Sequence, residues 1–274
     1  MDRHFVSRIV ITLAALLAPP LTAGPITMYL SAPGVQTNAD WCPAGSPSCG
    51  STVINFDSLT AGNVTAAPYV SAIGTYEASL TTPFNVQAAN QYGGAGGTGK
   101  YFAVGVQSNS TTPVALDLNT LSTYFGLWWS AGDAYNGLSF YSGGTLIQRE
   151  TTADVVTLLN HGTGTISAAN GNVYNTSAYF GNPNANFPGM DSGEPFAFLS
   201  FVSSTPFDRV VFDNSGSLAS GFESDNHTLI SGTYLVPDSA VQVGATPESS
   251  SMSMAGGGLL AFLLVAAFRY YRKL

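Results

Sequence analysis

The sequence predicts an all-β protein, an antiparallel two-sheet β-sandwich of jelly-roll type. Short runs rich in β-branched and aromatic residues recur along the chain. Clusters of Gly, Asn, Ser, Pro and Asp separate them, which is the pattern of strands joined by turns. Little of the chain has helical spacing, and no repeat with a period of about 20 to 50 residues stands out, which argues against a solenoid. Many short strands with little helix are typical of a two-sheet sandwich.

The individual elements follow from these runs. Residues 138–149 predict a hairpin, because Ser142, Gly143 and Gly144 tolerate the positive φ angles of a tight turn. Residues 152–159 predict one helix, with Thr152 as its candidate N-cap. The Gly-rich stretch 162–186 is expected to be a long surface excursion. Strands are expected at residues 52–56, 101–106, 124–129, 138–141, 145–149, 196–202, 209–212 and 228–230.

The N-terminus has the regions of a secretory signal peptide. Arg3, His4 and Arg8 precede an apolar segment at residues 9–18, and the small-residue region that follows ends at Ala23. We therefore expect signal peptidase to cleave after Ala23, so that residues 1–23 take no part in the fold. The alternative is a retained anchor, which the short apolar segment disfavours because a span needs about 20 apolar residues.

The C-terminus has the three parts of a sorting tail. Polar residues dominate the linker at 237–251, an apolar run covers 252–268, and residues 269–274 are mostly basic or aromatic. An apolar helix of this length can just cross a bilayer with a hydrocarbon core of about 30 Å. Because basic flanks stay in the cytoplasm, the body would be left outside.

This tail resembles the PEP-CTERM sorting signal of Gram-negative, biofilm-forming bacteria, whose Pro-Glu-Pro triplet is recognised by a membrane-embedded exosortase. Pro247 and Glu248 match the first two positions of the triplet, and Ser249 takes the place of the second proline. The alternative is a plain tail anchor, which also has an apolar run and a basic flank.

Four phrases of the body are similar to those of exosortase-dependent surface proteins. The resemblance implies export through the inner membrane, transient anchoring by residues 252–268, and processing by signal peptidase and an exosortase. It also implies residence at the cell surface or in the extracellular matrix, but it is silent on activity. The phrases are I-N-F-D-S-L at 54–59, the aromatic block at 124–144, F-D-R-V-V-F at 207–212 and F-E-S-D-N-H at 222–227.

The body between the two signals is strongly acidic. We expect an N-terminal segment at 24–52 and a sandwich domain at 53–236. The chain has sixteen carboxylates, of which Asp2 and Glu248 lie outside the body, whereas the body holds few basic residues. Such a surface cannot neutralise phosphates, so nucleic acid is excluded as a partner. The basic residues of the body are Lys100, Arg149 and Arg209.

The two cysteines of the chain, Cys42 and Cys49, predict a local disulfide. An isolated pair separated by a Pro- and Gly-containing turn in an exported chain is most simply a staple. The short loop limits its entropic contribution to about 2–3 kcal/mol. A redox role is the alternative, and a metal site would need two more soft ligands.

Two catalytic motifs are rejected. The stretch 93–100 matches the start of a phosphate-binding loop, but Tyr101 replaces the magnesium-binding hydroxyl and no helix follows, so a flexible loop is expected. Glu223 and Asp225 begin the E-x-D-x-x-E phrase of some sandwich-fold glucan hydrolases, but Thr228 replaces the last acid. His161 and His227 are isolated, and a solvated surface is the default for these groups. We therefore predict no catalytic residue and no enzyme activity.

Aromatic residues raise the possibility of sugar binding. Trp128, Trp129 and Tyr135 offer flat faces for a pyranose ring, as does Trp41 earlier in the chain, with Asp133 and Asn136 as hydrogen-bonding groups. Adjacent strand residues point to opposite faces, so at least one of the two neighbouring tryptophans is expected in the core. Core packing is the alternative for both.

Three acidic residues predict a calcium site. Asp57 follows the first expected strand, while Glu223 and Asp225 lie near the last, and the terminal strands of a jelly roll commonly lie side by side. Calcium takes several oxygen ligands of this kind. The alternative is that Asp57 and Asp225 cap backbone amides in turns and that Glu223 is solvated.

Two classes of function remain from the sequence. The favoured class is a non-catalytic surface or biofilm-matrix protein that is sorted by an exosortase and associates with extracellular polysaccharide. The other class is a secreted glycan-active enzyme with a divergent sandwich-fold active site.

Overall fold

The computed structural model describes residues 25–46, 49–214 and 218–243. In this part of the chain all strand pairings are antiparallel, and one short helix accompanies them, which confirms the all-β prediction. Thirteen strands form one connected sheet, and two more form a separate ribbon. The strands are β1 (Ile26–Leu30), β2 (Ser51–Ile54), β3 (Gly62–Val64), β4 (Tyr69–Val70), β5 (Gly74–Tyr76), β6 (Phe84–Ala88), β7 (Lys100–Gly105), β8 (Val114–Ser130), β9 (Gly137–Ser142), β10 (Thr145–Thr151), β11 (Thr165–Ser167), β12 (Val173–Asn175), β13 (Ala197–Asp213), β14 (Gly221–Ile230) and β15 (Val241–Gln242).

The two longest strands, β8 and β13, pair with each other along two stretches. Residues 124–129 pair with 197–202, and residues 114–117 pair with 209–212, with register shifts between them. In the first stretch β1 and β14 are the outer neighbours, whereas β9 and β5 are the neighbours in the second. The expected strands 196–202 and 209–212 are therefore two halves of β13, and the irregular region between them contains Pro206, which lacks an amide proton.

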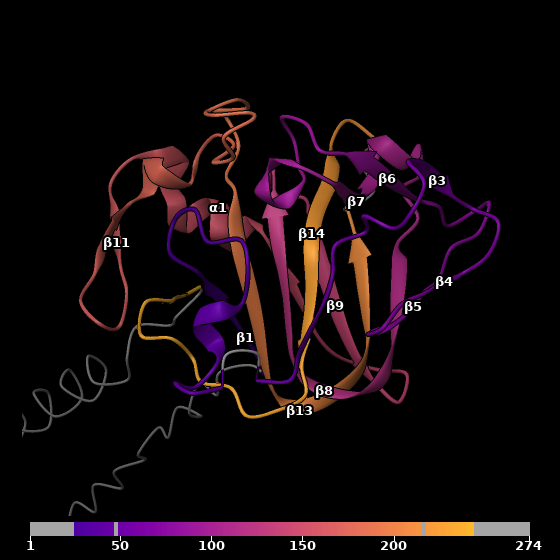
Figure 1. Cartoon of the computed structure of the whole chain (residues 1–274), viewed down its shortest axis with the longest axis horizontal. Helices are drawn as coiled ribbons and strands as arrows, with labels where there is room; N and C mark the ends of the chain where they lie inside the picture. The colour runs from indigo at the N-terminus through magenta and orange to yellow at the C-terminus, as the bar shows by residue number, and fades with distance from the viewer. Residues whose placement is uncertain (1–24, 47–48, 215–217, 244–274) are drawn as a thin grey trace, which may run out of the picture.

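Figure 1 shows β1, β13, β8 and β14 in the middle of the molecule, with β3, β4 and β5 on one side and α1 with β11 on the other. Most of the buried apolar side chains of these strands form one large cluster, in which phenylalanine is frequent, and some belong to two smaller clusters. Trp128 and Trp129 belong to different clusters, as expected for neighbouring positions on a strand.

The predicted hairpin and helix are both confirmed. β9 and β10 are joined by Gly143 and Gly144. Their φ angles are 55° and 80°, and a type I′ turn requires positive φ at both central residues. The helix α1 is Ala153–Leu159, but Thr152 makes no side-chain cap. Its hydroxyl instead donates to the carbonyl oxygens of Asp133 and Asn136, which ties the start of the helix to the β8–β9 loop.

The two segments that flank the predicted sandwich domain belong to the same sheet. β1, in the expected N-terminal segment 24–52, pairs with β13, and β15, in the expected linker 237–251, pairs with β1. Alternate residues of β1 are buried, so this short strand contributes to the core. The boundaries at 52 and 236 therefore do not divide the folded body.

The Gly-rich loop at 93–100 is held by side chains rather than free. Asn182 donates to the carbonyl oxygen of Asn90 at 3.2 Å, and Asn184 and Asn186 donate to carbonyl oxygens inside the loop at 3.2 Å and 2.7 Å. These asparagines lie at the end of the segment 162–186, which was predicted to be a long surface excursion. The same segment contains the β11–β12 ribbon.

The export signals lie outside the described residues. These are residues 1–23 with Ala23, the sorting residues Pro247 and Glu248, the apolar run 252–268 and the tail 269–274. Within residues 25–46, 49–214 and 218–243, no helix is both long and apolar enough to cross a membrane.

Candidate functional site

An acidic pocket of about 270 Å³ lies on the outer side of β14. β14 supplies Glu223, and the loop after β8 supplies Asp133. Glu194 comes from the loop before β13, Gln107 from the turn after β7, and Tyr92 from the loop between β6 and β7. The site is thus assembled from five separate parts of the chain, at the ends of strands whose register the core fixes.

Glu223 is the most enclosed carboxyl of this pocket. The alternation of β14 places Phe222 and Ser224 in the core and Glu223 on the outer face, where it is only 4% exposed. The side-chain amide of Gln107 donates to it. Gly221 leaves room for this contact, because a methyl group there would overlap both side chains.

Burial is the main cause of the perturbed acidity in the pocket. It raises the pKa of Glu223 well above its usual value, and the charges of Glu194 and Asp133 raise it further, while Gln107 acts in the opposite direction. Burial, with the hydrogen bond and charge of Asp191, raises the pKa of Glu194 to about 8. Burial also raises the pKa of Asp133. At neutral pH Glu194 therefore retains its proton, and burial favours the protonated form of Glu223 and Asp133.

The pocket offers a ligand several side-chain oxygens that accept hydrogen bonds, and the carboxyls that keep their protons can also donate. No Lys, Arg or His is among the described residues that line it. Gln107 Oε1, which belongs to this lining, is a buried oxygen without a hydrogen-bond partner in the described part of the chain. Unsatisfied buried acceptors are costly, so a donor-rich molecule is the chemical class that this lining favours.

A second pocket of about 300 Å³ contains two of the three expected calcium ligands. Asp57 and Asp225 both line it, together with Asn55, Gln36 and Asn226, whereas Glu223 lines the first pocket. Among the residues that the structure describes, no group of three or more His, Cys, Asp or Glu side chains is placed to hold a metal ion. The expected triad is therefore not brought together.

The carboxylates of the second pocket bind protein donors. Asp57 Oδ1 accepts from the amide of Lys100 at 2.7 Å, and Asp225 accepts from the amides of Ala95 at 2.8 Å and Asn226 at 2.7 Å. Burial raises the pKa of Asp225 to about 8 despite these two hydrogen bonds, and the charge of Asp57 adds to the increase. This is the capping arrangement given above as the alternative, except that Glu223 is buried rather than solvated.

Most of the expected sugar-contact residues are inaccessible. Trp128, Trp129 and Asn136 are fully buried, and so is Trp41. Trp129 Nε1 donates to Asn136 Oδ1 at 2.7 Å, so this buried pair holds the loop between β8 and β9 in place. For these residues the packing alternative is correct, because no face is left for a ligand.

Asp133 lines the first pocket, whereas Tyr135 is exposed in the same loop and is not among the lining residues. Tyr135 is 58% exposed, and its amide donates to Asp133 Oδ1 at 2.6 Å. The loop therefore carries an exposed ring two residues away from a carboxyl that lines the pocket. Tyr92, Gln107 and Glu194 were not predicted, since each lies in a loop whose place is set by tertiary contacts.

His227 is in the core and not at a solvated surface. Its Nε2 atom lies 2.9 Å from Ser224 Oγ, and its Nδ1 atom lies 2.8 Å from the hydroxyl of Tyr76. The ring stacks on Phe212 at a centroid distance of 4.9 Å, and burial lowers the pKa of His227 to about 3. Ser224 is fully buried, so this pair has no access to substrate and is structural.

Comparison with known proteins adds no assignment: neither a family model, nor a curated protein, nor a solved structure matches this chain. The candidate site therefore stands on its own geometry.

Proposed function

We propose that this protein is an exported, non-catalytic cell-surface or biofilm-matrix protein whose acidic pocket binds extracellular polysaccharide. Support for export and for sorting by an exosortase comes from the signal-like N-terminus and from Pro247 and Glu248 before the apolar tail. The localisation we propose is the surface or matrix of a Gram-negative bacterium, reached through a transiently anchored form.

The observation that carries the binding proposal is the acceptor-rich lining of the pocket at Glu223. Sugar hydroxyls are hydrogen-bond donors, and the protonated carboxyls can also donate to ring and glycosidic oxygens. Tyr92, which is 41% exposed, lines the pocket, and Tyr135 lies beside Asp133. Exposed aromatic rings next to polar groups suit the apolar and polar sides of a pyranose. Polyuronates should be disfavoured, because no cationic side chain is among the described residues that line the pocket.

We also propose the jelly-roll sandwich as the finer description of the fold. The support is the change of neighbours along β8 and β13, since each strand has one outer neighbour in its first paired stretch and another in the second. Long strands that change partners in this way connect two layers.

The second candidate function is glycan hydrolysis. It is favoured by Glu194 and Glu223, two neighbouring carboxyls with raised pKa values, because a glycosidase needs a protonated acid. A hydrolase also needs a second, ionised carboxylate, and Asp133 is the candidate in this pocket.

Glycan binding by the secreted body at pH 6 tests both functions. A panel of neutral, amino and uronic acid glycans should show retention of neutral or amino glycans without product release. Glu223→Gln should weaken binding by on the order of tenfold, equivalent to about 1.4 kcal/mol. The matched control is Glu77→Gln, at an exposed carboxylate outside the pocket. Equal binding by both variants would contradict the proposed site, and product release would favour the enzyme.

A further inference from the structure

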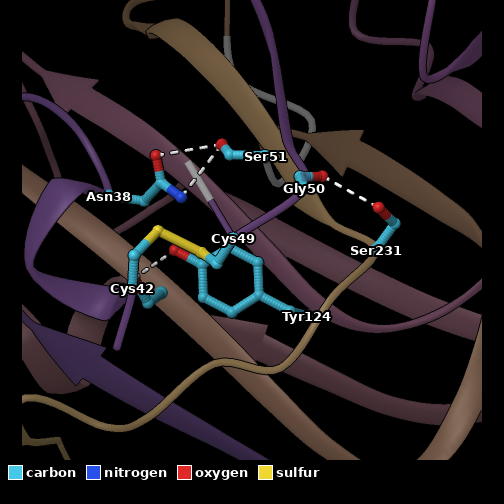
Figure 2. Close-up of a disulfide and its surroundings, with 8 residues drawn as sticks. Asn38, Cys42, Cys49, Gly50, Ser51, Tyr124 and Ser231 are labelled. Atoms are coloured by element: carbon cyan, nitrogen blue, oxygen red, sulfur yellow. Dashed lines mark hydrogen bonds between the residues drawn. A yellow bond between two sulfur atoms is a disulfide. The ribbon is translucent and has the colours of Figure 1, made fainter. Parts of the chain in front are cut away.

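The disulfide loop lies against a segment that follows β14, residues 231–235, which we call the C-terminal strap. The strap leaves β14 at Ile230 and leads towards β15. The predicted bond between Cys42 and Cys49 is present, with Cα atoms 5.2 Å apart. Figure 2 shows the disulfide beside Tyr124, with Gly50 and Ser231 joined by a hydrogen bond.

Backbone hydrogen bonds attach the strap to both ends of the disulfide loop. At one end, the amide of Gly232 donates to the carbonyl oxygen of Cys49 at 3.1 Å, and the amide of Ser231 donates to that of Gly50 at 3.2 Å. At the other end, the amide of Leu235 donates to the carbonyl oxygen of Trp41, the neighbour of Cys42, at 3.0 Å. The strap therefore depends on the position of both cysteines.

An aromatic cluster packs the strap onto the loop. Trp41 is buried and lies 6.3 Å from Tyr234 and 5.2 Å from Tyr124 between ring centroids. The hydroxyl of Tyr234 donates to Thr123 Oγ1 at 3.0 Å. Detachment of the strap would therefore expose this aromatic cluster to water.

The fit between strap and loop allows little adjustment. A methyl group on Gly232 would lie 2.6 Å from the carbonyl oxygen of Cys49. Cys49 has a φ angle of 35°, which is uncommon for a residue other than glycine. A backbone in this conformation needs its surroundings to hold it, and the covalent bond to Cys42 does so.

We propose that the Cys42–Cys49 disulfide is a redox latch for the C-terminal strap. The thiols of Cys42 and Cys49 form the disulfide when they transfer two electrons and two protons to a disulfide of another protein, which becomes a dithiol. Once this bond has formed, the strap docks on the disulfide loop. Reduction by a dithiol reverses this step, and residues 231–235 detach while the β8–β13 pairing remains. If the protein is exported as proposed, the strap docks only after the chain reaches an oxidising compartment.

Amide hydrogen exchange measured by NMR on the secreted body tests the latch. On reduction with a phosphine, the amides of Ser231, Gly232 and Leu235 should exchange at least about tenfold faster, whereas those of the β8–β13 pairing should not change. The double variant Cys42→Ser/Cys49→Ser should show the reduced pattern with and without phosphine. Gly232→Ala should release the strap with the disulfide intact.

Either of two results would overturn the latch. One is unchanged protection of the three strap amides after reduction. The other is simultaneous loss of protection in β8 and β13, which would make the disulfide a general staple of the fold. Neither readout involves glycan or exosortase, so failure here is distinct from failure of the proposed function.

Discussion

Glu223 and Asp225 lie two residues apart on the outer side of β14, but their carboxyls line two different pockets. The loop between β6 and β7 contributes Tyr92 to the first pocket and Ala95 to the second, where the amide of Ala95 binds Asp225. Alternation along a strand thus placed both acids on one face, while a loop from elsewhere in the chain gave them different surroundings.

The raised pKa of Glu194 predicts that the protein is more stable at mildly acidic pH than at pH 8. The native state keeps a proton up to about pH 8 that the unfolded chain releases near the ordinary value of 4.5. Stability from this group is therefore lost as pH rises through that window. Thermal melts should show a falling midpoint between pH 5 and pH 8.

Glu194→Gln should reduce this pH dependence to the part contributed by Asp225 and Glu223, whose pKa values are also raised, because glutamine resembles the protonated acid and can still donate to Asp191. Glu77→Gln, at an exposed carboxylate outside the pocket, is the matched control. An identical slope in wild type and Glu194→Gln would show that this carboxyl is not the source.

The lowered pKa of His227 predicts destabilisation at low pH. In the unfolded chain His227 binds a proton below about pH 6.5, whereas in the native state it does so only below about pH 3. Stability is therefore lost as pH falls through this range. His227→Phe should cost on the order of 2–3 kcal/mol at pH 7, because Ser224 and Tyr76 lose their partner. In denaturant titrations this difference should shrink at pH 4. A constant difference would mean that the imidazole does not titrate as proposed.

Truncation of a buried and of an exposed aromatic residue should have different effects on the free energy of unfolding. Trp128→Ala should reduce the free energy of unfolding by about 3–5 kcal/mol, since the side chain is fully buried. Tyr135→Ala should change it by about 0.5 kcal/mol or less, because exposed positions tolerate truncation. Urea titration measures both. Reduced glycan binding by a folded Tyr135→Ala protein would support a contact role.

Calcium should have little effect on thermal stability. The oxygens of Asp225 already accept backbone hydrogen bonds, and Asp57 accepts from Lys100 and Asn55. Melts with calcium and with chelator should coincide. A calcium-dependent rise that disappears in Asp225→Ala would restore the calcium site expected from the sequence, with an ion replacing the amide donors.

The sorting proposal predicts a shortened mature protein. If an exosortase recognises Pro247 and Glu248, the mature chain should lack residues 252–274, which mass spectrometry of the native protein would show. Changing both residues to alanine should leave an uncleaved form in the inner membrane. The control is Pro237→Ala with Asp238→Asn, outside the proposed motif. An intact tail in wild-type mature protein would rule out this processing.

The sequence predicted those features that depend on local pattern. Turn residues that tolerate positive φ, set between two runs of strand-forming residues, were enough for the β9–β10 hairpin. Apolar residues at helical spacing were enough for α1, and two nearby cysteines were enough for the disulfide. β3, β4 and β5 have only two or three residues each, too few to show alternation. Their positions follow from pairing with strands far away in the chain.

The candidate site was only partly predictable for the same reason. Glu223 and Asp133 were identified as polar residues near strands, but no local signal joined them to Gln107 and Glu194. Trp128 and Trp129 show the reverse case, because their aromatic character is compatible with a binding face, and only the packing of both sides of β8 shows that they are buried.

The pairing of β1 with β15 has a consequence for chain connectivity. These strands are antiparallel, with Leu30 opposite Val241, and the amide of Val243 donates to the carbonyl oxygen of Met28 at 2.9 Å. The first and last parts of the folded body therefore meet at one edge. A short peptide from Val243 to Pro25 should close the chain, and new ends opened at Gly143–Gly144 would interrupt no strand. The protein is thus a natural candidate for circular permutation, in which the new ends would lie in the β9–β10 turn instead of at this edge.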